Sequence, residues 1–172
     1  KELSELSLEG NQLEQLTVGV FAGLRKLQDL NLAHNRLVGF PRGVFDRNLN
    51  LTRLNLAGNR FKVFESELLR LQTHMSFLSL SQIELQELSL NFTFLDKLEA
   101  HSCDMRSLTV MGTIRELDLH NNSLSDIPHL PQALNVSSLD LSLNPLGSMQ
   151  GNPFRRLTHL LRLNISAAKL HE

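Results

Sequence analysis

The sequence predicts an α/β repeat fold, a solenoid with a parallel concave sheet and a mostly irregular convex side. Two observations lead to this prediction. One pattern, seen as "IRELDLHNNSLSDI" from Ile114, recurs eight times along the 172 residues. Within each copy, apolar and polar residues alternate over only about three residues, which is too short for a strand to be stable alone. The recurrence indicates that neighbouring copies supply the missing strand partners.

The copies follow one another at intervals of 24, 24, 24, 20, 19, 22 and 24 residues. Their first residues are Leu3, Leu27, Leu51, Met75, Leu95, Ile114, Val136 and Leu160. Because successive side chains of a strand point to opposite faces, Leu117 and Leu119 are expected to point inward and Asp118 outward. Each copy then lies beside the next as a parallel strand at a spacing of about 4.8 Å.

The ninth position of most copies is expected to turn the chain inward. Asparagine occupies it in five copies, at Asn11, Asn35, Asn59, Asn122 and Asn144. Its amide must bond backbone groups of the turn, since each buried group left unpaired costs about 1–3 kcal/mol. Ile83 and Ala168 cannot make these bonds, so we expect loosening or a substitute water there, whereas Cys103 fits the pattern.

Phenylalanines are expected to stack along the convex side. In three 24-residue copies a phenylalanine stands eighteen positions after the first residue, at Phe21, Phe45 and Phe154. The fourth copy lacks it, and either Phe92 or Phe94 is expected to fill the same place.

The spacing L-x-x-L-x-L-x-x-N/C-x-L at this period resembles the leucine-rich repeat, and the eight copies extend the resemblance over the entire chain. The mixture of 24-residue and shorter units is similar to Toll-type receptor ectodomains and to secreted leucine-rich immune proteins of insects. That resemblance implies a leucine-rich-repeat solenoid that binds a ligand or partner in innate immunity or development. Extracellular members usually have cysteine-rich caps at both ends, whereas 1–172 contains a single cysteine. We therefore expect 1–172 to be one array of about eight repeats within a longer protein.

Composition excludes several functions. The net charge is −1, from 17 basic and 18 acidic residues, and neither tyrosine nor tryptophan is present, so no nucleic-acid partner is expected. No apolar run approaches the roughly 18 residues of a membrane span, so this segment is not expected to insert in a membrane. The sequence has no phosphate-binding loop, no cysteine pair at zinc spacing and no nucleophile elbow, so we expect that the chain is not an enzyme and binds no cofactor. Cys103 is expected to be a buried thiol rather than half of a disulfide.

Five N-x-S/T sequons favour secretion, because the 14 asparagines and 23 serines or threonines predict only about two by chance. The alternative is that the repeat is simply rich in these residues. Asn50 and Asn135 precede the first residues of their repeats, and Asn91 is expected in the outer loop of the fourth repeat. Asn164 is expected on the strand face, with Asn121 beside it.

Two rows of side chains are expected to line the concave face. The first row is Glu5, Asp29, Arg53, Phe77, Lys97, Glu116, Ser138 and Arg162, and the second is Ser7, Asn31, Asn55, Ser79, Glu99, Asp118, Asp140 and Asn164. Phe77 resembles an exposed interface anchor, although it could equally fold against a neighbouring strand. The ligand-binding residues predicted on this face are Arg53, Phe77, Lys97, Glu99, His101, Asp118 and His120.

Carboxylates and imidazoles gather on adjacent strands of this face. Glu99, Asp118 and Asp140 are neighbours, and His101 and His120 follow two residues after the first two of them. Such a group could bind a divalent metal or make the affinity for a partner pH-dependent. We favour the alternative of a solvated polar face, and no metal is predicted.

The sequence leaves two functions open. The first is an extracellular recognition module that binds a protein or microbial ligand through the concave face or a flank. The second is a structural or adhesive protein whose solenoid is a spacer and a self-association surface. Because the repeat specifies the fold and not the partner, the surfaces must decide between them.

Overall fold

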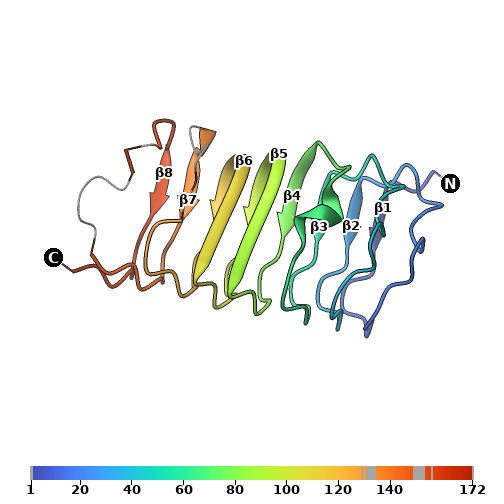
Figure 1. Ribbon diagram of the computed structural model, residues 1–172, viewed down its shortest axis with the longest axis horizontal. Coiled ribbons are helices and arrows are strands. Elements are labelled where there is room, and N and C mark those ends of the chain that lie inside the picture. The colour runs from blue at the N-terminus through green and yellow to red at the C-terminus, as the bar shows by residue number, and fades with distance from the viewer. Residues whose placement is uncertain (1, 129, 131–134, 149–153, 156, 172) are drawn as a thin grey trace.

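Each repeat contributes one short strand whose leucines face inward and whose polar residues face outward. The computed structural model describes residues 2–128, 130, 135–148, 154–155 and 157–171. Figure 1 shows the strands side by side in chain order, from β1 near the N-terminus to β8 near the C-terminus. The eight strands form a single parallel sheet, so the predicted solenoid is confirmed.

Most strands are as short as the sequence indicates. The elements are β1 (Glu5–Ser7), β2 (Asp29–Asn31), β3 (Arg53–Asn55), the 3₁₀ helix η1 (Ser66–Leu69), β4 (Met75–Ser79), β5 (Glu87–Glu99), β6 (Ser107–Asp118), β7 (Ser138–Asp140) and β8 (Arg162–Asn164). The register aligns equivalent residues of successive repeats, as when Arg53 of β3 pairs with Asp29 and with Phe77. Both predicted rows of the concave face are therefore confirmed.

The core is continuous and follows the leucines of the repeats. Leu30, Leu54 and Leu78 are fully buried one behind another. On the convex side the rings of Phe21 and Phe45 stack with their centroids 5.9 Å apart, as predicted. Phe154 is half-buried against the same core.

Burial shows which of Phe92 and Phe94 fills the core position of the fourth repeat. Phe92 is 6% exposed and belongs to the core, whereas Phe94 is 38% exposed. Phe92 therefore takes the place that Phe21 and Phe45 take in their own repeats.

The asparagine ladder binds consecutive repeats through their backbones. The Nδ2 of Asn59 donates to the carbonyls of Leu32 and Leu56, at 3.0 and 2.8 Å, and its Oδ1 accepts the N–H of Leu37 at 3.0 Å. Asn35, Asn122 and Asn144 make equivalent bonds. Each amide thus pairs groups that the turn would otherwise leave unsatisfied.

The substituted ladder positions remain buried. Cys103 still donates from Sγ to the carbonyls of Leu80 and His101, both at 3.2 Å, which agrees with its expected role as a buried thiol. Ile83 and Ala168 are 1% and 2% exposed, so they fill the core without such bonds.

The convex side is mostly irregular, apart from η1 and an extended stretch at the shortest repeats. Residues 87–91 pair with residues 107–111 on the return path, and a bulge between Asn91 and Phe94 precedes the concave part of β5. Both long strands therefore turn a corner. Asn91 consequently lies in a strand, and the prediction that it lies in an outer loop is wrong.

A glycine makes this corner possible. Gly112 in β6 has φ +107°, and a Cβ there would lie 1.5 Å from the carbonyl oxygen of Phe92. The two strands can approach this closely only because residue 112 has no side chain.

Candidate binding face

The second row of the concave face has a structural task that the sequence did not reveal. In this row Oδ1 of an asparagine or aspartate accepts the backbone N–H two residues later, which closes the turn at the end of the strand. The bond joins Asn31 to Ala33 at 3.0 Å and Asn55 to Ala57 at 3.1 Å. The same bond is made by Asp118, Asp140 and Asn164.

At the centre of the face, Arg53 connects β2 to β4. Its Nε lies 3.0 Å from Oδ2 of Asp29, and its guanidinium carbon lies 4.7 Å from the centre of the Phe77 ring. Phe77 is half-buried and does not belong to the apolar core. The two interpretations of Phe77 therefore combine, because the ring stays on the surface while a neighbouring strand partly covers it.

Charges next to this centre are paired. Nζ of Lys97 lies 2.7 Å from Oε1 of Glu99, and NH2 of Arg162 reaches Oε1 of Glu116 at 3.1 Å across β7. The hydrogen bond that Lys97 donates to Glu99 outweighs partial burial and raises the pKa of Lys97 above its ordinary value. These exposed pairs orient side chains more than they stabilise the fold.

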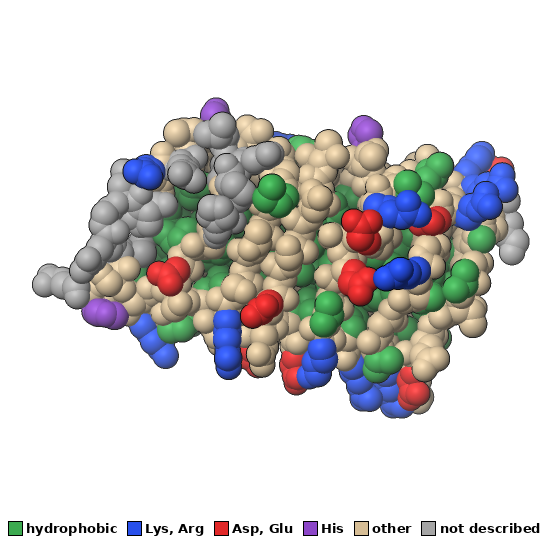
Figure 2. Space-filling model, viewed as in Figure 1, with side chains coloured by type: hydrophobic (Ala, Val, Ile, Leu, Met, Phe, Trp, Pro, Cys, Tyr) green, Lys and Arg blue, Asp and Glu red, His purple; other side chains and the backbone are tan. Residues whose placement is uncertain are grey.

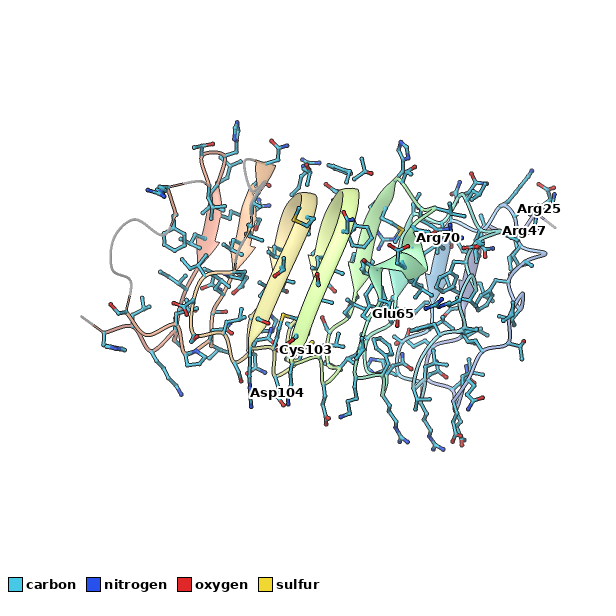
Figure 3. The ribbon with its side chains drawn as sticks, in the orientation of Figure 1. Arg25, Arg47, Glu65, Arg70, Cys103 and Asp104 are labelled. Atoms are coloured by element: carbon cyan, nitrogen blue, oxygen red, sulfur yellow. The ribbon has the colours of Figure 1, made fainter. Side chains whose placement is uncertain are left out.

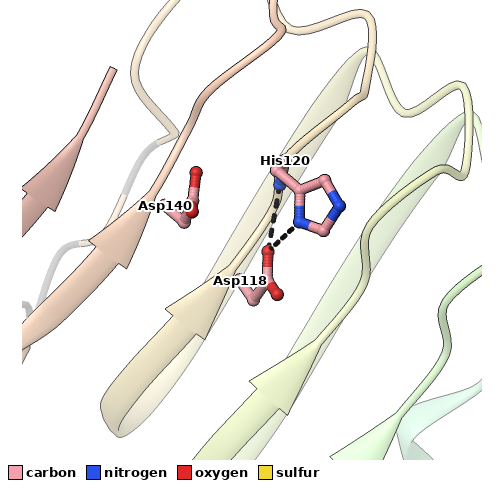
Figure 4. Close-up of side chains that lie close together, drawn as sticks. All are labelled: Asp118, His120 and Asp140. Carbon is pink, nitrogen blue, oxygen red and sulfur yellow. Dashed lines mark hydrogen bonds and ion pairs between the residues drawn. The ribbon is translucent and has the colours of Figure 1, made fainter. Parts of the chain in front are cut away.

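The predicted histidine and carboxylate group is confirmed as a spatial cluster. The rings of His101 and His120 stack with centroids 4.3 Å apart. Nδ1 of His120 lies 2.7 Å from Oδ1 of Asp118, and Figure 4 shows both beside Asp140 on the next strand. Glu99 turns instead toward Lys97.

Asp140 is held by donors on both oxygens. Ser142 donates its N–H and hydroxyl to Oδ1 at 2.9 and 2.6 Å, and Nδ2 of Asn164 donates to Oδ2 at 2.9 Å. Burial alone would raise the pKa of this carboxyl, but these hydrogen bonds outweigh it and lower the pKa.

The five sequon asparagines are all exposed. Asn164 lies on the concave face in β8, and Asn121 follows β6 with its Nδ2 bonded to Oγ of Ser102 at 3.0 Å. Asn50, Asn91 and Asn135 lie outside the concave rows. Their placement is compatible with glycosylation, which stays a prediction.

A second candidate surface, which we call the flank groove, was not found from the sequence. It has a volume of about 930 Å³ and is lined by apolar and charged residues of both signs, among them Val38, Phe40, Arg60, Val63 and Leu68. Figure 3 labels two more of its residues, Glu65 and Arg70, next to η1. Figure 2 shows acidic and basic side chains interspersed on this side of the molecule, which gives the groove no single charge.

Among the residues that the structure describes, no helix is long and apolar enough to cross a membrane.

Comparisons with known proteins identify the repeat. Leucine-rich-repeat models match residues 1–82 and 113–134, which together make up more than half of the chain. No match is found among curated protein sequences.

Solved structures resemble the whole array. They include the LRIM1/APL1C complex (22% identity, TM-score 0.70), the leucine-rich repeat domain of APL1B (22%, 0.67) and the Toll–Spatzle complex of Drosophila (22%, 0.66). In the same order, the matched region covers 95%, 92% and 96% of this chain. It covers only 35%, 55% and 27% of the length of the solved chains. Repeat pattern, sheet and family matches agree, and the chain belongs to the leucine-rich-repeat family.

Proposed function

We propose that this chain is an extracellular recognition module that binds a protein ligand through its concave face, as part of innate immunity. The observation that carries the proposal is the centre of that face, where Phe77 stands half-buried among polar side chains under the guanidinium of Arg53. An aromatic ring held in place beside an arginine combines two residue types that are enriched at protein interfaces.

The residues around this centre give the patch a polar rim. Lys97 and Glu99 lie on β5, next to Phe77, and the pair neutralises itself. His101, Asp118 and His120 lie at the end of β5 and β6 and form the margin of the patch. A rim of paired charges favours selectivity among partners more than affinity.

The sequons favour the same location. Glycans are bulky and solvated, so a partner cannot dock over an occupied site. Glycans on Asn50, Asn91 and Asn135 would leave the concave face open, while those on Asn121 and Asn164 would cover its C-terminal end. The accessible patch would then be centred on β3, β4 and β5.

The structural neighbours support a protein partner. The LRIM1/APL1C structure is a complex of leucine-rich proteins, and the Toll–Spatzle complex is described as a molecular hub in Drosophila development and innate immunity. Members of this fold family are typically scaffolds for protein interaction and not enzymes. At 22% identity the likeness shows the fold, and the immune role is our proposal.

The test begins with extracellular fluid of the source organism, passed over the immobilised chain. Each retained protein is then titrated against the parent, Phe77→Ala, Arg53→Ala and the control Ser138→Ala. The control removes a side chain from the same row, two strands beyond Lys97. We expect Phe77→Ala to weaken binding by about 2 kcal/mol or more and the control to have little effect.

Circular dichroism checks that the variants are folded. Occupancy of the sequons is tested separately, by the loss of mass when protein secreted from eukaryotic cells is digested with a glycosidase. Equal affinity of the parent, Phe77→Ala and Arg53→Ala would contradict the proposal. Replacement of Val63 by aspartate would then test the flank groove. A chain that retains only copies of itself would favour the spacer and adhesion function.

A further inference from the structure

Asp118, His120 and Asp140 bring three possible metal ligands together at the end of β6 and β7. One ligand atom from each side chain lies within 4.8 Å of the other two, and no other such group occurs among the residues that the structure describes. All three side chains are half-buried, so the ligands are partly shielded and still reachable from solvent.

The carboxylates of this group differ in their ion pairs from three other acidic side chains of the face. Asp29, Glu99 and Glu116 on the same face each have a lysine or arginine partner. Within the described part of the chain, Asp118 and Asp140 make no ion pair with a lysine or arginine, and the imidazole of His120 is their only titratable neighbour in the group. Two neighbouring carboxylates without a cation favour the binding of one.

The side chains are also held as metal ligands usually are. Ser142 and Asn164 donate to both oxygens of Asp140, and the ring of His101 stacks on His120. Outer hydrogen bonds of this kind fix the orientation of ligating carboxylates, and their loss typically costs 10–100-fold in metal affinity.

We propose that Asp118, His120 and Asp140 form a binding site for a zinc-type divalent cation. An imidazole nitrogen with two carboxylate oxygens suits zinc, which takes such ligands at about 2.0–2.2 Å and can complete its shell with water. Calcium fits less well because it requires about six to eight oxygen ligands. The site lies at the margin of the Phe77 patch, but its test measures metal binding and not partner binding, so either proposal can fail without the other.

The repeats themselves supply the substitutions for a test. The residues equivalent to Asp118 in β2 and β3 are Asn31 and Asn55, and they close the same turn with Oδ1. The residues equivalent to His120 there are alanines, Ala33 and Ala57. Asp118→Asn, Asp140→Asn and His120→Ala therefore remove ligands while copying residues that this fold already accepts.

The experiment is a calorimetric titration of the parent and these three variants with Zn²⁺ at neutral pH. Glu116→Gln is the matched control, because Glu116 lies on the same strand and face but outside the group. We expect one saturable ion per chain in the parent and the control. Each ligand variant should bind at least about tenfold more weakly.

Specificity is tested in the same protein. Ca²⁺ should bind more weakly than Zn²⁺, because the group offers an imidazole nitrogen and fewer oxygen ligands than Ca²⁺ requires. In the parent, nuclear magnetic resonance should show Zn²⁺ shifting the ring signals of His120, which needs no variant to fold.

Three results would overturn the proposal. They are the absence of saturable binding, a Zn²⁺ affinity unchanged in all three variants, and tighter binding of Ca²⁺ than of Zn²⁺. The second result would assign the ion to one or more of the six histidines other than His120, since the chain has seven in total.

Discussion

Replacing Asn122 by alanine tests the asparagine ladder at the position that makes the most hydrogen bonds. Its Oδ1 accepts the N–H groups of Cys103 and Met105, at 2.9 and 3.1 Å. Its Nδ2 donates to the carbonyls of Ala100 and Leu119, both at 2.8 Å. The side chain is 7% exposed, so water cannot freely replace these bonds.

The magnitude follows from the number of groups left unpaired. Three backbone groups lose their partner, because the carbonyl of Leu119 keeps a bond from Nδ2 of Asn144. At the lower limit of about 1 kcal/mol each, the free energy of unfolding should fall by about 3 kcal/mol. Asn122→Cys should lose about 2 kcal/mol, because a thiol can donate to a carbonyl, as Cys103 does, but is a weak acceptor for the two N–H groups.

The matched control is Asn11→Ala. Asn11 occupies the same ladder position and donates to the carbonyls of Leu8 and Glu9, but it is exposed to solvent. Water can take over its bonds, so the loss should stay below about 1 kcal/mol. Urea unfolding followed by circular dichroism measures all three variants. A loss below 1 kcal/mol for Asn122→Ala, or equal losses for Asn122→Ala and Asn11→Ala, would refute this reasoning.

Three further predictions concern single positions. Gly112→Ala should abolish or strongly destabilise folding, measured as soluble yield and thermal midpoint, whereas Gly23→Ala, which has open space around it, should be tolerated. Burial raises the pKa of the Cys103 thiol to about 11. A disulfide reagent at pH 8 should therefore react slowly with the thiol in the native protein and rapidly in urea. Equal rates in the two conditions would contradict the burial of Cys103. The pKa of Asp140 is lowered from 3.8, so its carboxylate stabilises the fold above that pH, and this contribution is lost as the pH falls through the lowered pKa. In urea unfolding below pH 4, the free energy of unfolding of Asp140→Asn should therefore depend less on pH than that of the parent. An unchanged pH profile would count against this prediction.

The strands, their register and both rows of the concave face could be predicted because one period governs them all. Alternation within a repeat determines which side chains point inward, and the repeat spacing determines which residues become neighbours. Arg53 beside Phe77 follows from that register. The contact between the guanidinium and the ring does not, because it depends on the rotamer of a long flexible side chain.

The corner of β5 and β6 was missed, although the sequence contains a signal for it. Leu88, Leu90 and Phe92 alternate with polar residues, as do Leu108 and Val110, and all five are buried. This period of two is typical of a strand, but it lies on the return path, where the longer repeats are irregular. The repeats of 20 and 19 residues have fewer residues for that path, and an extended chain covers the same distance with fewer residues than an irregular one.

Asp118 and Asp140 show why polar residues on such a face are difficult to assign from sequence. Each closes the turn after its strand, a task that asparagine performs equally well in β2, β3 and β8. The turn therefore explains an Asx side chain at these positions, but it does not explain a negative charge. Two adjacent aspartates add charge that the turn does not need and that no lysine or arginine in the described part of the chain pairs with, whereas Glu99, the other acidic residue of this row, is paired with Lys97. That excess charge, together with the adjacent imidazole, is what distinguishes a cation site from a row of turn-closing residues.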